Sequence, residues 1–206
     1  MYRIMTITVW LLVIKTVLVT WISYADYFPP NFQANFLLGR QSTFHGPYAV
    51  AFYVHILSGP VALLAGLFLM NSSWRKRFPQ AHRIVGRWQL VCVLMLVVPS
   101  GMWMARFTNS GWLTDAAFMT LAVGTSWCAF CGWRTAINRQ FRQHQIWMTR
   151  TFALLCSAVV LRIMGGLATL FAWQDTYPFA AWLSWFMPLA ACEWMLVRFH
   201  RKRTRS

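Results

Sequence analysis

Long apolar runs separated by short polar segments dominate the chain, and six of these runs are long enough to cross a membrane. A spanning helix needs about 20 consecutive apolar residues, and lipid leaves helices as the only open-chain structure that satisfies its own backbone. The six predicted spans cover approximately 5–24, 48–70, 88–105, 112–133, 147–172 and 180–199. The pattern therefore predicts an all-α, polytopic transmembrane helix bundle, with 1–206 forming a single membrane domain.

Basic residues alternate between the connecting segments. The connections after the second and fourth spans and the C-terminal tail are rich in Lys and Arg, whereas the opposite connections have Arg40 and Arg106 as their basic residues. Basic connections are retained in the cytoplasm. Both termini are therefore predicted to be cytoplasmic, which agrees with the even number of spans.

The longest connection, 25–47, lies on the predicted outer side and mixes aromatic residues with Pro29, Pro30, Gly39 and Gly46. Such breakers favour a folded loop, and a connection this long is often functional. We expect it to fold back over the outer mouth of the bundle as a candidate lid, with a short helix near 32–38.

Prolines interrupt three of the spans, at Pro60, Pro99 and Pro188. A proline inside a membrane helix frees a carbonyl four residues earlier, and neighbouring helices then have to supply a donor. The helices can kink at these positions where neighbouring helices supply the freed carbonyls with partners.

The composition fits a membrane protein. Of the 206 residues, 58% are hydrophobic and 11% are charged, against about 25% charged in soluble domains. A net charge of +15 could indicate nucleic acid, but the basic residues gather in short segments between spans, as topology selection requires. We therefore expect no nucleic-acid partner. The five cysteines all lie in apolar runs, which favours packing over disulfides or zinc.

Ionisable residues inside spans cost about 3 kcal/mol at a helix centre, so each needs a partner or a role. Counting about 1.5 Å per residue places His55 and Arg162 both in the outer third of the membrane. Together they could bind an anionic or polarised group, such as a propionate, a carboxylate or a quinone oxygen. Alternatively, Arg162 reaches the outer headgroups or binds backbone carbonyls, while His55 bonds across helices.

Two further histidines, His82 and His144, precede odd-numbered spans on the predicted cytoplasmic side. Facing each other, they could ligate a metal or the iron of a haem. Alternatively, they join neighbouring arginines in a basic collar that binds anionic lipid headgroups. The arginines of this collar include Arg83, Arg87 and Arg150.

Glu193 lies near the cytoplasmic end of the sixth span, so we expect it to pair with Arg87 or Arg150. Lys15 lies near the middle of the first span, where it would line a polar cavity or contact a carbonyl.

Three stretches carry a resemblance to a known family: HILSGPVALLAG from His55, RKRFPQAHRIVGRW ending at Trp88, and HQIWMTRTFALLCSAVVLR ending at Arg162. Over 48–162 the chain resembles the DUF2306 family of predicted bacterial membrane proteins, although Gln145 stands where the family usually has Arg. The resemblance implies a multi-pass protein of the bacterial inner membrane. The scattered histidines are also similar to those of haem-bearing bundles such as cytochrome b561, an analogy of pattern.

Three functional hypotheses follow. The first is a redox membrane protein that binds haem b or a quinone, with a redox partner or a second copy of the chain. The second is a transporter or lipid-binding protein with a polar cavity, and the third is a structural or accessory subunit. Hydrolase and nucleotide-driven motifs are absent from the sequence, and whether the protein is an enzyme stays open.

Overall fold

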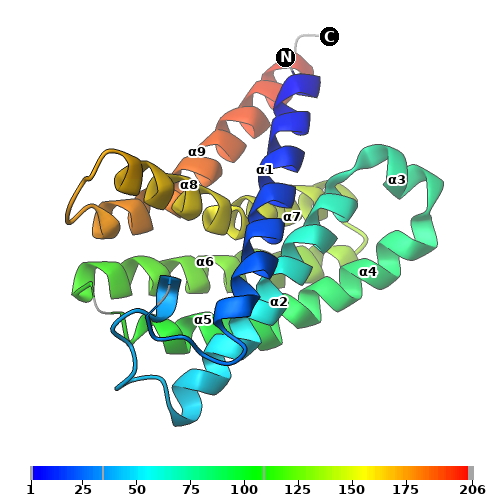
Figure 1. Ribbon diagram of the computed structural model, residues 1–206. Coiled ribbons are helices and arrows are strands. Elements are labelled where there is room, and N and C mark those ends of the chain that lie inside the picture. The colour runs from blue at the N-terminus through cyan, green and yellow to red at the C-terminus, as the bar shows by residue number, and fades with distance from the viewer. Residues whose placement is uncertain (1, 34, 109, 204–206) are drawn as a thin grey trace. The chain divides into compact units, whose positions relative to one another are not determined.

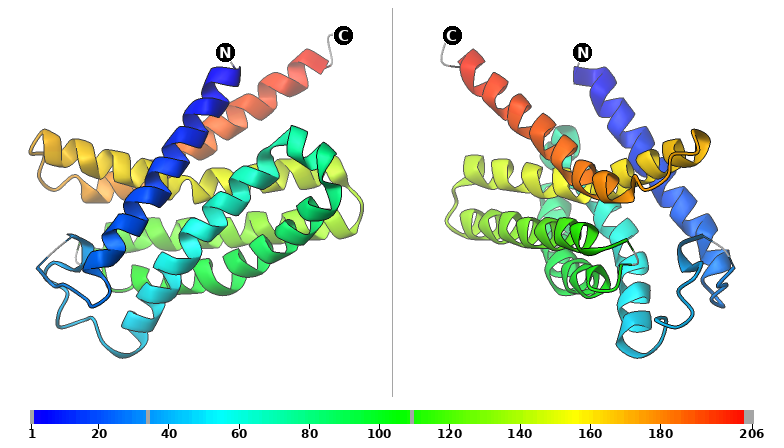
Figure 2. Two further views of the ribbon diagram at one scale, coloured as in Figure 1. Left: turned by 45° about the vertical axis from the view of Figure 1, so that its right-hand side comes forward. Right: turned by 90° about the vertical axis from the view of Figure 1, so that its left-hand side faces the viewer.

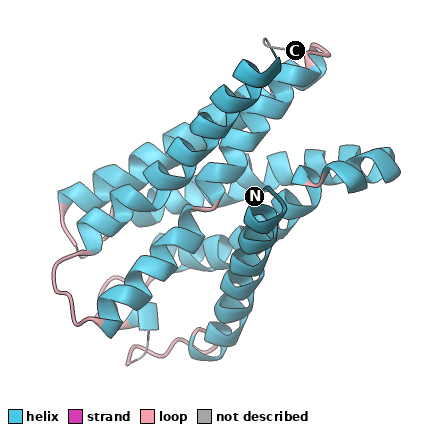
Figure 3. Cartoon of the chain, turned by 90° about the horizontal axis from the view of Figure 1, so that it is seen from above, coloured by secondary structure: helices cyan, strands magenta, loops and turns pink. Residues whose placement is uncertain are grey.

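The computed structural model describes residues 2–33, 35–108 and 110–203, with side chains for 6–33, 36–108 and 110–198. In these ranges the regular structure is helical, and one isolated bridge joins Tyr27 and Pro30 (Figure 3). Six helical stretches are long and apolar enough to span a membrane. They are Thr6–Asp26, Gly46–Met70, Pro79–Ala105, Trp112–Ile137, Phe141–Leu170 and Tyr177–Arg198. The predicted all-helical architecture with six spans is confirmed, while the cytoplasmic location of the termini stays a prediction.

The chain forms two compact units, Met1–Thr108 and Asn109–Ser206. In the first unit, α2 and the continuous helix made by α4, η3 and α5 run antiparallel as a hairpin, and α1 packs on α2 (Figures 1 and 2). The helices of this unit are α1 (Tyr2–Ile22), η1 (Ser23–Asp26), η2 (Asn35–Leu37), α2 (Gly46–Met70), α3 (Ser72–Arg77), α4 (Pro79–Val91), η3 (Cys92–Val97) and α5 (Val98–Ala105).

The second unit is also built on an antiparallel hairpin, between α6 and α7, and α9 packs against α6, α7 and α8. A turn at Cys156 separates α7 from α8, although the two form one span. The helices of this unit are α6 (Trp112–Ile137), α7 (Phe141–Leu155), α8 (Ser157–Leu170) and α9 (Tyr177–Arg203).

The third and fifth spans begin earlier than the apolar pattern predicts. The third begins at Pro79 rather than 88, and the fifth at Phe141 rather than 147. Polar residues do not stop a helix when they occupy one face of it, and Pro79 at the first position has the helical φ built in. As a result, His82 and His144 each lie at the fourth residue of a helix instead of in the connection before it.

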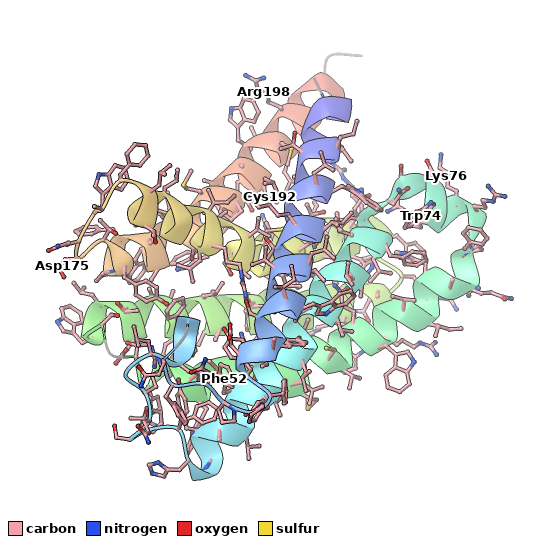
Figure 4. All side chains as sticks on the ribbon, viewed as in Figure 1. Phe52, Trp74, Lys76, Asp175, Cys192 and Arg198 are labelled. Carbon is pink, nitrogen blue, oxygen red and sulfur yellow. The ribbon has the colours of Figure 1, made fainter. Side chains whose placement is uncertain are left out.

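The outer connection packs as an aromatic cluster onto the start of α2. Tyr27, Leu37, Tyr48 and Phe52 are buried there together, and Phe52 is labelled among these side chains in Figure 4. The expected short helix near 32–38 is only a three-residue 3-10 turn, Asn35–Leu37, followed by Gly39 in the left-handed region at φ +71°, where the helical path ends. Its role as a lid stays a prediction.

Arg40 ties this connection to two spans. Its guanidinium lies 3.2 Å from the Tyr48 hydroxyl and 3.1 Å from the Phe107 carbonyl oxygen, while Nε donates to the Phe36 carbonyl at 3.1 Å. The guanidinium carbon also lies 4.3 Å from the centre of the Phe36 ring. The connection is therefore held closely over the N-terminal end of α2 and the C-terminal end of α5.

The proline inside α2 has the compensation that was expected. Pro60 cannot donate to the Ile56 carbonyl four residues earlier, and the Tyr24 hydroxyl donates to that oxygen instead, at 2.6 Å. A donor from another helix thus satisfies the carbonyl that proline leaves exposed.

Candidate functional site: two histidines held by main-chain carbonyls

His55 lies in the middle of α2 and contacts the third span through one ring nitrogen. Its Nδ1 lies 3.1 Å from the Val97 carbonyl oxygen and 3.1 Å from the Ser100 hydroxyl oxygen. A carbonyl oxygen can only accept a hydrogen bond, so Nδ1 carries the hydrogen. In the neutral ring, Nε2 is then the nitrogen with the lone pair.

Gly101 allows the ring to lie this close to α5. A Cβ atom at residue 101 would stand 3.1 Å from His55 Cε1 and 3.4 Å from Nδ1, which is tighter than ordinary contact. The π-helical turn Cys92–Val97 ends directly before this contact, with the Val98 N–H donating to the Val93 carbonyl. Turns of this kind are frequent at functional sites.

Polar contacts continue along the same hairpin towards α3. The Cys92 thiol lies 3.6 Å from the Ser58 carbonyl oxygen, and the Gln89 amide donates to the Ala62 carbonyl at 3.1 Å. Gln89 is 4% exposed. This hairpin therefore contains a row of side chains that bond to main-chain carbonyls of the facing helix.

His55 and His82 cannot share one ligand. His55 meets the third span at Val97, fifteen residues from His82 on one continuous helix, which corresponds to about 22 Å along its axis. The two histidines therefore belong to separate places in the first unit, as the sequence pattern indicated.

His144 is held in a similar way within the second unit. Its Nδ1 lies 2.8 Å from the Gly132 carbonyl oxygen on α6. The Thr135 hydroxyl shares its hydrogen between the Cys131 carbonyl at 2.8 Å and this same oxygen at 3.0 Å. A Cβ atom at residue 132 would stand 2.6 Å from Met148 Sδ, so the glycine permits the close approach of α7. Here too the proton belongs on Nδ1.

Arg150 and Glu193 form a bidentate ion pair between α7 and α9. Nε to Oε1 measures 2.6 Å and the second nitrogen to Oε2 measures 3.0 Å. The Arg150 guanidinium also lies over the Trp147 ring, 4.7 Å from its centre. The partner expected for Glu193 is thus found in Arg150, and the pair compensates both charges in the span.

The other candidate residues lie apart from these contacts. Arg162 donates to the Ala158 carbonyl of its own helix at 3.3 Å, Lys15 is exposed on α1, and Arg83 and Arg87 are exposed one turn apart on α4. The pairs of His55 with Arg162 and of His82 with His144 each join residues of different units, so both pairings stay predictions. Within the described ranges, no three metal-binding side chains gather as an ion site.

Sequence reasoning missed the residues that hold the histidines, namely Val97, Ser100, Gly101 and Gly132. Gly101, two residues after Pro99 in the third span, was the available signal of a close helix contact. The histidine that it faces, His55, is far away in the sequence, so the signal did not identify the partner.

Six long apolar helices define a multi-pass integral membrane protein. The profile of the family described as "Predicted membrane protein (DUF2306)" matches residues 52–196, and the chain belongs to this family. No curated protein and no solved structure matches. The matched range contains both held histidines and the ion pair, whereas Lys15 and the outer connection lie before it.

Proposed function

We propose that this membrane protein is a redox-type helical bundle that binds haem b or a quinone. The observation that carries the proposal is that His55 and His144 each donate Nδ1–H to a main-chain carbonyl of a facing helix. Histidines that ligate a metal usually have their second ring N–H fixed in this manner. The same orientation gives Nε2 the lone pair that haem iron, or the hydroxyl of a quinone in its reduced quinol form, requires.

Two sites follow from this proposal, one in each half of the membrane. In the outer half, Arg162 would join His55 and attract a propionate or a polarised oxygen. On the cytoplasmic side, His82 would join His144 as a second imidazole for haem iron. Both pairings are taken from the sequence pattern, in which His82 and His144 each precede an odd-numbered span.

Absorbance spectroscopy tests the haem version. The protein purified in detergent, oxidised and then reduced with dithionite, is expected to show a Soret band and sharp reduced bands that disappear in His82→Ala and His144→Ala. His45→Ala is the matched control, because His45 is exposed at the start of α2. Organic extraction with mass spectrometry tests the quinone version. A folded, colourless protein that also yields no quinone would contradict the proposal.

A second candidate function, binding of anionic lipid headgroups, is favoured by the geometry of α3. The Asn71 side chain accepts from Ser73 N at 3.0 Å and from Trp74 N at 3.1 Å, which caps the helix. Trp74 packs with ring centres 5.3 Å from Trp10 and 5.3 Å from Phe68. This fixed turn carries three consecutive basic residues, Arg75, Lys76 and Arg77, and Figure 4 labels Trp74 and Lys76 on it.

Anionic lipid should bind at this basic turn with about 1 kcal/mol for each charge near the surface. The triple change of Arg75, Lys76 and Arg77 to Gln should therefore reduce co-purified anionic lipid, measured by lipid mass spectrometry. The matched control replaces Arg139, Arg142 and Arg198. An equal loss in both variants would show that the turn is not a specific site.

We also propose that both termini lie on the cytoplasmic side of a bacterial inner membrane, with a redox partner or a second copy of the chain as the protein partner. The basic connections support this orientation. Reporter fusions at each terminus, one active only in the cytoplasm and one only outside it, would contradict the orientation if either terminus reports from outside.

A further inference from the structure

We infer that the third span is a positioning device for His55: the Val97 carbonyl, Ser100 and Gly101 fix the ring in its Nδ1–H form. The atom that His55 offers to a ligand is then Nε2, which selects an electron-pair acceptor, either a metal ion or a hydroxyl donor. The choice of ligand rests on the proposed function, whereas the position of the proton is a property of the protein itself.

The hydrogen atoms around Nδ1 leave one consistent arrangement. Ser100 has a single hydroxyl hydrogen, and the oxygens near that hydroxyl on its own helix are the carbonyls of Leu96 and Val97. When the hydroxyl donates to either carbonyl, its lone pairs face His55 Nδ1. Val97 offers a second lone pair to the same nitrogen. Two acceptors therefore meet Nδ1, and the hydrogen between them has to come from the ring.

Gly101 fixes the position of the ring by the absence of a side chain. With 3.1 Å between His55 Cε1 and a Cβ atom at residue 101, any other residue would displace the imidazole or α5. Ring displacement would lengthen both 3.1 Å contacts of Nδ1 and release the preference for the Nδ1–H form.

The backbone around this contact is specialised for it. Pro99, which has no N–H to donate, stands two residues after the end of the π-helical turn Cys92–Val97. Ser100, the next residue, is 6% exposed. The irregular backbone of the third span is thus concentrated where His55 contacts it, while α2 supplies the ring from an unbroken helical segment.

A lone pair at Nε2 discriminates between ligands that otherwise look alike. A quinone carbonyl is an acceptor and would face an acceptor, whereas the hydroxyl of the reduced quinol donates. Iron of a haem also accepts the lone pair. The shared requirement is an electron-pair acceptor, and a quinol analogue should bind more tightly than the matching quinone by about tenfold, the value of one hydrogen bond.

Nitrogen NMR of the histidine side chains tests the position of the proton directly. The full-length protein with ¹⁵N-labelled histidine, reconstituted in lipid at neutral pH, should show a His55 signal pair with Nδ1 protonated and Nε2 unprotonated. Comparison with His55→Gln assigns the signals. Gly101→Ala, which displaces the ring from both acceptors, should shift the pair towards the Nε2–H form. Ser100→Ala removes one acceptor and leaves the Val97 carbonyl, so it should shift the pair in the same direction by less, an effect that a merely structural role would not produce.

Two neighbouring substitutions serve as controls. Ser58→Ala removes a buried hydroxyl that bonds within α2, and Gly59→Ala adds a Cβ atom with nothing within 4 Å. Neither should move the His55 signals. An unprotonated Nδ1 in the native protein would overturn the inference, as would equal shifts in the control and test variants. If Gly101→Ala does not fold, Ser100→Ala alone decides.

Ligand titration then separates this inference from the proposed function. Haemin, a short-chain quinol and the matching quinone are each titrated into the native protein and into Ser100→Ala. Binding of haemin or quinol that weakens in the variant supports the choice of ligand, and the spectral change of haemin distinguishes the two. Preferential binding of the quinone would overturn that choice. Binding of none of the three would contradict the proposed function and leave the NMR result standing.

Discussion

The hairpins of the two units hold a histidine by the same ring atom but by different means. In the first unit, a histidine in the middle of α2 contacts an irregular helix, a serine hydroxyl and a glycine. In the second, a histidine in the first turn of α7 is met by a regular helix, whose glycine carbonyl also accepts from Thr135. The acceptor is a main-chain carbonyl in both.

Main-chain carbonyls, rather than carboxylates, accept the hydrogen bonds of the two histidines in a chain where carboxylates are scarce. The chain has four acidic residues among its 206. Asp26 and Asp115 lie in the terminal turns of their spans, and Glu193, which lies farther from a span end, is paired with Arg150. A neutral acceptor orients an imidazole without adding a charge to the membrane interior, where charge is expensive. The comparison shows that Glu193 of the second unit pairs with Arg150, whereas Nδ1 of both histidines bonds to a main-chain carbonyl.

The largest loss of stability is expected from breaking the ion pair between Arg150 and Glu193, a kind of contact that neither described histidine contact contains. Arg150→Met would leave Glu193 without its partner and should destabilise the protein by about 2 kcal/mol, below the value for a fully buried pair because both groups are partly exposed. Thermal unfolding in detergent measures the change. The double variant Arg150→Met with Glu193→Gln should recover most of the loss, and no recovery would contradict the pairing.

A smaller difference should separate the two glycines. In Gly101→Ala the new methyl group would contact an imidazole held by two hydrogen bonds, so the free energy of unfolding should fall by about 1–2 kcal/mol. In Gly132→Ala the closest atom belongs to the flexible Met148 side chain, which can move aside, so the loss should be smaller. Unfolding of Gly101→Ala, Gly132→Ala and the double variant Gly132→Ala with Met148→Ala measures this. Equal costs at both glycines would remove the distinction between the hairpins.

Tyr24→Phe should cost about 1 kcal/mol, because the Ile56 carbonyl lacks a helical donor opposite Pro60. Tyr53→Phe is the matched control, since its hydroxyl donates at 2.9 Å to the Tyr27 carbonyl in the outer connection, where water can replace it. A larger loss in Tyr53→Phe than in Tyr24→Phe would contradict this reasoning.

The smallest change is expected for Thr135→Val, which removes the second donor to the Gly132 carbonyl. His144 remains bonded to that oxygen, so the loss should be about 0.5 kcal/mol. The combination with His144→Phe should cost more than the sum of the single changes, since it leaves the carbonyl without either side-chain donor. Strict additivity in the unfolding free energies would show that the two donors act independently.

Local physics explains which parts of this structure could be predicted from the sequence. The six spans follow from the length of apolar runs, the donor opposite Pro60 from the missing N–H, and the partner of Glu193 from the cost of a bare charge. The true starts of the third and fifth spans were missed because polar residues on one face of a helix weaken the apolar signal without ending the helix.

The contacts of the histidines could not be predicted, because they depend on how two helices face each other. Nothing near His55 in the sequence indicates that Ser100 lies beside it. The π-helical turn Cys92–Val97 lies in an apolar run whose pattern predicts an ordinary α-helix. The position of the hydrogen on the His55 ring depends in turn on those contacts, so the sequence alone does not predict it.

The bond from Tyr24 to the Ile56 carbonyl has a practical meaning for work on the whole family. Residues 52–196 define family membership, yet the donor for one of the carbonyls in that range comes from outside it. A chain shortened to the shared range would carry an unsatisfied oxygen in hydrocarbon. Relatives that lack a tyrosine at the end of the first span should therefore have replaced Pro60 as well, so the two positions are expected to vary together.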